Sequence, residues 1–195
     1  MNYTREQIEA AVKAKGYVYF DGAKDYDVNI IGVRNSATGN DVTHIVKMAQ
    51  DHFQQEIDLI YTPDPVAYSR NITLAVVNQF YLPTTELLSV AYSDDNQLLA
   101  YTWARANERA AWSDDRMVVI RMAHVALDLS PRIRIQLITD MMMLWENFAR
   151  YSHTPIICST TMRNDQQSFL KLHKRNGYDV RGSYAYKRLN LGTQQ

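Results

Sequence analysis

The chain of 195 residues contains a single cysteine, Cys158, which excludes an internal disulfide bond and a zinc site made of several cysteines. A continuous run of about 18 apolar residues is missing, and residues 1–5 are polar, so we expect neither a membrane span nor a conventional secretory signal. Excess charge is missing too, because 21 Lys and Arg balance 21 Asp and Glu. This balance argues against a general nucleic-acid binder.

The remaining composition is that of an ordinary globular protein. Apolar residues make up 46% of the chain and charged residues 22%, which excludes a collagen-like or largely disordered protein. The length suits one sizeable domain with one hydrophobic core. Neither an internal repeat nor a domain linker is visible in the sequence.

Hydrophobic periodicity predicts an alternation of helices and strands. The turn at 93–96 separates two β-like runs and indicates an antiparallel hairpin, while Pro131 marks a helix start and Gly177 a helix end. In chain order, the expected elements begin with a helix at 4–15, a strand at 28–33, a helix capped at 40 or 41 with apolar residues at 45–60, and a helix at 66–80. Strands at 86–92, 98–105 and 117–127, a helix at 131–148, a strand at 155–160, a helix at 165–174 and a strand at 178–189 follow. The predicted class is mixed α/β around a single central sheet.

The second half of this order resembles the GNAT superfamily of acyl-CoA-dependent N-acyltransferases. The resemblance is clearest where the long strand ends in Asp-Leu-Ser-Pro at 128–131, and in the ending Lys-Leu-His-Lys-Arg-Asn-Gly-Tyr at 171–178. It covers about residues 28–189 and implies a GNAT-like single domain, with a central, mostly antiparallel mixed sheet flanked by helices. Residues 1–27 would then be a short N-terminal extension containing a helix, and 190–195 a C-terminal tail.

The resemblance also implies a cofactor, acetyl-CoA. In the family it lies where the fourth strand separates from the fifth, with its pyrophosphate against N–H groups at the start of the following helix. The positions implied here are Arg132, Arg134 and Gln136. The family's loop glycines are absent, and Ile133 and Ile135 stand about where they are expected. The two arginines can instead pair directly with phosphate, or they are simply solvated.

Three residues are candidates for acetyl transfer to an amine, which needs a base for the amine and an acid for the departing thiolate. In the family, a tyrosine before the last Gly-aromatic pair often acts as the acid, and counting back from Gly177 places His173 at its position. For the base, the candidates are Glu86 on the hairpin and His124, which strand alternation places on one face with Met122. The alternative for His124 is a core histidine with satisfied hydrogen bonds, and for His173 a surface or packing role. No metal site is expected.

A second resemblance suggests a different function. The stretch 25–43 resembles an N-terminal segment of assorted phage-encoded proteins, including lytic ones. It implies a viral origin, with the protein in the host cytoplasm or in the virion. The alternative to the acyltransferase is therefore a catalytically silent GNAT-fold protein of a phage head, neck or tail. Such a protein would act through protein partners or as a homo-oligomer, without a specific nucleic acid or a membrane, and Ile133 and Ile135 would close its cofactor cleft.

Overall fold

The computed structural model describes residues 32–34, 36–56, 61–93, 95–111, 113–161 and 166–182. Its elements in chain order are β1 (Gly32–Arg34), a 3-10 turn (Gly39–Asp41), α2 (Val42–Glu56), α3 (Pro65–Tyr81), β2 (Glu86–Tyr92), β3 (Leu98–Arg109), β4 (Arg116–Val125), α4 (Pro131–Tyr151), β5 (Ile156–Cys158) and α5 (Gln167–Arg175). The expected extensions 1–27 and 190–195, with the helix at 4–15, lie outside these ranges.

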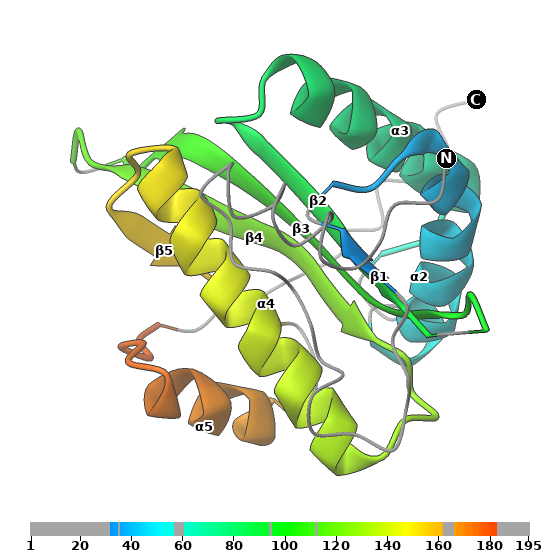
Figure 1. The fold of residues 1–195 in the computed structure, drawn as a ribbon. Coiled ribbons are helices and arrows are strands. Elements are labelled where there is room, and N and C mark those ends of the chain that lie inside the picture. The colour runs from blue at the N-terminus through cyan, green and yellow to red at the C-terminus, as the bar shows by residue number, and fades with distance from the viewer. Residues whose placement is uncertain are drawn as a thin grey trace, which may run out of the picture.

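A five-stranded sheet with the order β1-β2-β3-β4-β5 forms the centre of the molecule (Figure 1). Strands β1 to β4 pair with one another in antiparallel fashion, whereas β5 pairs with β4 in parallel. A parallel pair needs a crossover connection, and α4 provides it. The expected mixed and mostly antiparallel sheet is confirmed.

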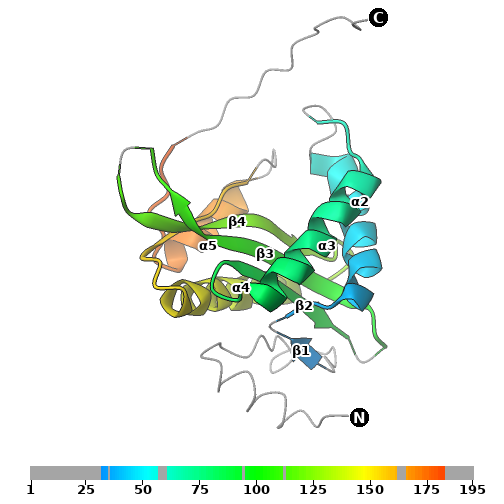
Figure 2. The same cartoon turned by 90° about the horizontal axis from the view of Figure 1, so that it is seen from above.

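Helices cover both faces of this sheet, with α2 and α3 on one side and α4 and α5 on the other (Figures 1 and 2). The core is correspondingly divided into two clusters. On the α4 face, Leu137, Trp145 and Phe148 pack against the sheet. On the opposite face, Ile45 of α2 and Ile72 of α3 do so. The sheet is therefore buried between two layers of helix, which holds the backbone of its strands in place.

Local capping explains why the helices begin where they do. Asp64 accepts hydrogen bonds from the backbone N–H groups of Val66 and Ala67, and Pro65 is the first helical residue of α3. Ser130 caps α4 in the same way, followed by Pro131. Both helices match the sequence expectations closely because these signals are local.

Strand ends differ more from the expectations. β3 continues to Arg109, and Asn107 has a φ of 65° at the point where the register with β4 shifts, so a bulge lets the strand continue. β4 ends at Val125 rather than at 127, because a turn follows. The expectation of a strand at 178–189 is wrong for 178–182, and residues 183–189 lie outside the described ranges.

The helices in the part of the chain that the structure describes are each too short or too polar to cross a membrane.

We predict that Thr102→Val destabilises the fold by about 1–3 kcal/mol. The hydroxyl of this fully buried residue accepts a hydrogen bond from the Trp145 indole at 2.8 Å and donates one to the carbonyl of Met122 at 3.0 Å. Valine keeps the shape but leaves both partners unpaired. Urea unfolding measures the change in free energy.

Thr139→Val is the matched control, because the Thr139 hydroxyl donates only to the Ile135 carbonyl of its own helix at an exposed site. It should change the free energy of unfolding by less than about 0.5 kcal/mol. Equal effects of the two substitutions would contradict the importance of the buried hydrogen bonds.

Candidate functional site

The two strands at one edge of the sheet separate along their length. β4 and β5 pair only at Met117 with Ile156, Val118 with Ile157 and Val119 with Cys158. β5 then ends, whereas β4 continues to Val125. Beyond the last pair, the space between the strands is not closed by backbone hydrogen bonds.

A cavity of about 130 Å³ occupies this opening. Residues 120–125 of β4 and 159–161 after β5 form its two sides, and His52, Arg134 and Phe169 contribute from α2, α4 and α5. A larger hollow of about 620 Å³ lies between α2, the β2–β3 turn and residues 126–128, and the lining of both includes His52. The smaller cavity is the one that lies between the separating strands.

An irregularity in β4 lies beside the cavity. Met122 pairs with Trp103 and Ile120 with Ala104, so Arg121 has no residue opposite it in β3. Such a bulge bends a strand and redirects the side chains that follow it. Met122 and His124 then face α2 and α3, as the alternation predicted.

His124 is buried and lines the cavity. Its Nδ1 lies 2.7 Å from the Tyr101 hydroxyl, which lies 2.8 Å from the Tyr68 hydroxyl. Burial raises the pKa of Tyr68 far above its ordinary value, so this phenol keeps its proton. Because hydroxyl groups rotate, the Tyr101 hydroxyl can donate to Nδ1 or accept from an Nδ1–H, so the contact is compatible with either neutral tautomer and with the protonated ring.

A second histidine stacks on the first. The rings of His52 and His124 are 4.2 Å apart and nearly parallel, at 2°. The Nε2–H of His52 donates to the carbonyl of Val125 at 3.0 Å, since a carbonyl can only accept. This contact joins α2 to the end of β4 and fixes one side of the His124 ring.

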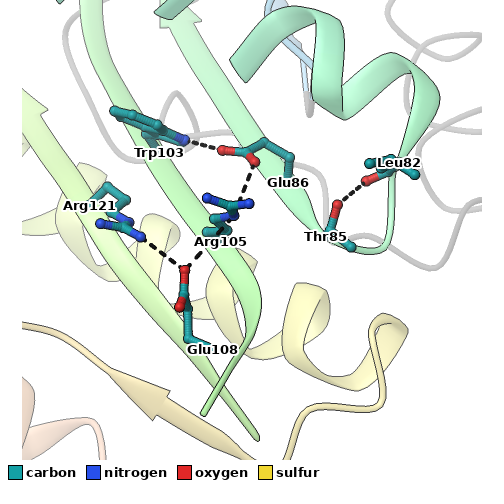
Figure 3. A network of polar contacts seen from close by, with 7 residues as sticks. All are labelled: Leu82, Thr85, Glu86, Trp103, Arg105, Glu108 and Arg121. Atoms are coloured by element: carbon teal, nitrogen blue, oxygen red, sulfur yellow. Dashed lines mark hydrogen bonds and ion pairs between the residues drawn. The ribbon is translucent and has the colours of Figure 1, made fainter. Parts of the chain in front are cut away.

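Glu86 lies at the start of β2 in a polar network with side chains of β3 and β4 (Figure 3). Its carboxylate accepts a hydrogen bond from the Trp103 indole and lies 3.8 Å from Arg105. Arg105 also contacts Glu108, and Glu108 pairs with Arg121 at 2.9 Å. Of these residues, only Arg121 lines the cavity. Burial raises the pKa of Glu86, opposed by the Trp103 hydrogen bond and the nearby positive charges.

The start of α4 borders the cavity through one of its two arginines. Arg134 lines the cavity, whereas Arg132 is exposed and does not. The Gln136 amide donates to Asp140 within the helix. Backbone donors are few here, because Pro131 has no N–H and the N–H of Ile133 points to the Ser130 hydroxyl.

The two isoleucines expected to close the cleft lie elsewhere. Ile133 packs into the core on the α4 face, and Ile135 is 54% exposed. Neither lines the cavity. A helix turns about 100° per residue, so positions 133 and 135 cannot both face the same side as Arg134.

His173 lies one layer behind the cavity. Its Nδ1–H donates to the Phe169 carbonyl at 2.9 Å, and its ring packs on Phe169 at 4.2 Å. Phe169 lines the cavity, whereas His173 does not. Burial lowers the pKa of His173, so the ring is neutral near pH 7, and its Nε2 is buried with no hydrogen-bond partner among the residues that the structure describes.

Ser159 is a polar group of the cavity that the sequence did not single out. Its hydroxyl is buried, lines the cavity and has no partner within the described ranges. A buried hydroxyl without a partner is unfavourable unless a ligand or water satisfies it. Its only signal in the sequence is its position near the end of the strand expected at 155–160, of which the structure forms 156–158.

The other residues that sequence reasoning missed are Tyr68, Tyr101 and His52. Their partners are distant in sequence, so no local motif marks them. Among the described residues, no group of three His, Cys, Asp or Glu side chains is arranged to hold a metal ion.

Neither a protein-family model nor a curated protein matches the chain. Solved structures do. A predicted acetyltransferase with acetyl-CoA from Clostridium acetobutylicum superposes with a TM-score of 0.63 at 14% identity, covering 84% of this chain and 99% of that one. Aminoglycoside N-acetyltransferase AAC(6')-Iy in complex with CoA gives a TM-score of 0.60 at 11% identity, covering 85% and 97%.

A third structure, aminoglycoside antibiotic 6'-N-acetyltransferase AAC(6')-Ih from Acinetobacter baumannii, gives a TM-score of 0.54 at 13% identity, covering 83% and 99%. At these identities the likeness establishes the fold alone. The chain has the fold of the GNAT acetyltransferases.

We predict that the free energy of unfolding of the Glu86→Gln variant rises relative to that of the natural protein as the pH rises from about 4 to about 7. Because the folded-state pKa of Glu86 lies above the unfolded-state value, the stability that this carboxyl contributes is present at low pH. It is lost as the pH rises through the folded-state pKa, whereas glutamine does not titrate.

Urea unfolding of both proteins across this pH range measures the difference in free energy. A difference that changes in the opposite direction would show that the contacts with Trp103 and Arg105 outweigh the cost of burial.

Proposed function

We propose that this protein transfers an acetyl group from acetyl-CoA to an amine acceptor. The observation that carries the proposal is the cavity between the separating ends of β4 and β5, which is lined by a buried histidine, a buried hydroxyl and an arginine. Two structures of the same fold contain acetyl-CoA or CoA, which supports the choice of cofactor.

The residues around the cavity fit such a ligand. The Ser159 hydroxyl needs a polar partner, which an amide or thioester oxygen can provide. The apolar lining around it, including Ile120 and Ile138, suits the acetyl group and the neighbouring alkyl chain. A cavity of about 130 Å³ has room for this end of the cofactor, while the larger remainder would lie outside it.

Arg134 would hold the pyrophosphate. It stands at the α4 end of the cavity, where the positive end of the helix dipole also favours an anion. With Pro131 in the first helical position, side-chain pairing replaces part of the backbone donation that a glycine-rich loop provides. Arg132 and Gln136 would contribute less, because Arg132 lies away from the cavity and the Gln136 amide is held by Asp140.

His124 would act as the general base. Acetyl-CoA supplies the acetyl group as an activated thioester, and an attacking amine must be neutral and lose a proton during transfer. The ring can take up that proton at Nε2 when Nδ1 already carries a hydrogen, and this Nδ1–H donates to Tyr101, whose hydroxyl can donate to Tyr68. The buried hydroxyl chain would therefore stabilise the imidazolium ion. The proton would then pass to the departing CoA thiolate.

Glu86 and His173 would act indirectly. Glu86 reaches the cavity through Arg105, Glu108 and Arg121, so it positions the arginine beside the bulge. His173 supports the ring of Phe169, which forms part of the cavity wall. Both are positioning residues in this proposal.

An amine acceptor is favoured by the larger hollow beside His52. The carboxylates of Asp51 and Asp128 line this hollow of about 620 Å³ together with the ammonium group of Lys47. The two negative charges outnumber the one positive charge, so the hollow would attract an amine in its ammonium form. Aminoglycosides, after which two of the similar enzymes are named, are one class of polyamine with which to test the acceptor.

We predict that Arg134→Ala weakens acetyl-CoA binding by about 10- to 100-fold, which corresponds to the loss of one charge-assisted hydrogen-bond pair. Arg132→Ala is the matched control, because it removes the same charge two residues away without touching the cavity. It should change the dissociation constant less than about threefold. Calorimetric titration measures both. Equal losses would instead indicate nonspecific charge attraction.

We predict that His124→Gln lowers the turnover number by about 100-fold or more, while the dissociation constant of acetyl-CoA is unchanged. Thiol release in the presence of a panel of primary amines measures turnover. His153→Asn is the control, since His153 is exposed just after α4 and lines neither the cavity nor the larger hollow, and asparagine tolerates its φ of 52°. Full turnover by the His124 variant would remove this residue from the mechanism.

A further inference from the structure

The outer face of α3 is unusually apolar for a surface helix. Its inner side, with Tyr68, Ile72 and Ala75, packs on the sheet. The side turned away from the sheet should then be polar (Figure 2). Instead, the large exposed side chains on α3 and directly after it are Val66, Leu74, Val77, Phe80, Tyr81 and Leu82.

This face has two complementary halves. The first half of the helix forms a shallow groove that is open to solvent, lined by residues that include Val66, Arg70 and Leu74. The second half ends in an aromatic pair, Phe80 and Tyr81, which are 79% and 73% exposed and pack edge to face on each other. Aromatic side chains that project from a surface are typical anchors of protein interfaces.

The groove and the aromatic pair lie at opposite ends of α3, so the aromatic pair of one copy can pack into the groove of a second copy. In an antiparallel pair of helices related by a two-fold axis between Thr73 and Leu74, Tyr81 lies opposite Val66 and Phe80 opposite Ala67. The aromatic pair of each copy then faces the groove of the other. Such a contact is isologous, so it forms a closed dimer.

We infer that this protein forms a two-fold symmetric homodimer through the outer faces of two antiparallel α3 helices.

The area of the face is sufficient for this role. Burial of its six large apolar side chains would remove roughly 700 Å² from water in each copy, close to the roughly 800 Å² per partner of a standard interface. Arg70 is the only charged side chain within α3. In this register it lies opposite Val77, near the C-terminal carbonyl groups of the second helix, where a positive charge is favourable.

The first experiment measures the mass of the full chain by sedimentation at a series of concentrations. We expect twice the 22.5 kDa mass of one chain. Leu74→Glu places a charge beside the axis and should raise the dissociation constant at least 100-fold. Ile135→Glu is the matched control, because Ile135 on α4 is equally exposed, at 54% against 53% for Leu74. It should leave the dimer intact.

The second experiment tests the register with a short bifunctional thiol reagent, after Cys158→Ala has removed the natural thiol. Leu74→Cys should cross-link to itself. Neither Val66→Cys nor Tyr81→Cys should do so alone, because each would lie about 22 Å from its own copy along the axis. A mixture of these two variants should cross-link.

A monomer at every concentration would overturn the inference, as would a dimer that Leu74→Glu does not weaken. Self-cross-linking of Val66→Cys would overturn the antiparallel register. Circular dichroism of each variant confirms that the fold persists, so that loss of the dimer is not loss of structure. None of these results depends on acetyl-CoA binding, so failure of this inference and failure of the proposed function are distinguishable.

Discussion

The short parallel ladder between β4 and β5 is the constraint on which the site depends. Three residue pairs hold the strands together, and the ladder stops at Val119 and Cys158. If it continued, backbone hydrogen bonds would close the sheet and no cavity would exist there. Because it stops, side chains from β4, α4 and α5 line a space within the fold, and the Arg121 bulge falls at the point where the strands separate.

Side chains of α2 and α3, which cover one face of the sheet, contact the polar groups around this opening and fix their positions. Tyr68 belongs to α3 and His52 to α2, and both contact residues on β3 or β4. Burying such groups is costly unless each has a hydrogen bond. The chain from Tyr68 through Tyr101 to His124 meets that cost and fixes the histidine at the cavity wall. The same helix, α3, thus supports the site on its inner side and presents its apolar side outward.

Much of the fold was predictable from the sequence because its signals are local. The caps at Asp64 and Ser130 and the hairpin turn define elements within a few residues of their observed ends. The pairing that assembles the site is not local. Tyr101 is 33 residues from Tyr68, and His52 is 73 residues from Val125, so neither contact leaves a pattern in the sequence. The strand expected at 178–189 is wrong for 178–182, where Asp179 and Gly182, which has a φ of 82°, are residue types depleted in strands.

The site residues were predictable in part. His124 was identified because it is a polar residue on an apolar strand, and the structure places it at the cavity wall. Its catalytic role stays a prediction. The alternative of a virion protein had Ile133 and Ile135 closing the cleft, but helix geometry directs one into the core and the other outward. The alternative of a cofactor-free virion protein also stays a prediction. Such a protein would not need an open cavity between β4 and β5.

The most direct test of the central claim is a crystal structure of the full chain grown with acetyl-CoA. The account predicts electron density for the thioester between residues 120–125 and 159–161, within reach of the Ser159 hydroxyl and His124, with the pyrophosphate on Arg134. A structure at saturating acetyl-CoA with the ligand bound elsewhere, or with none bound, would contradict it.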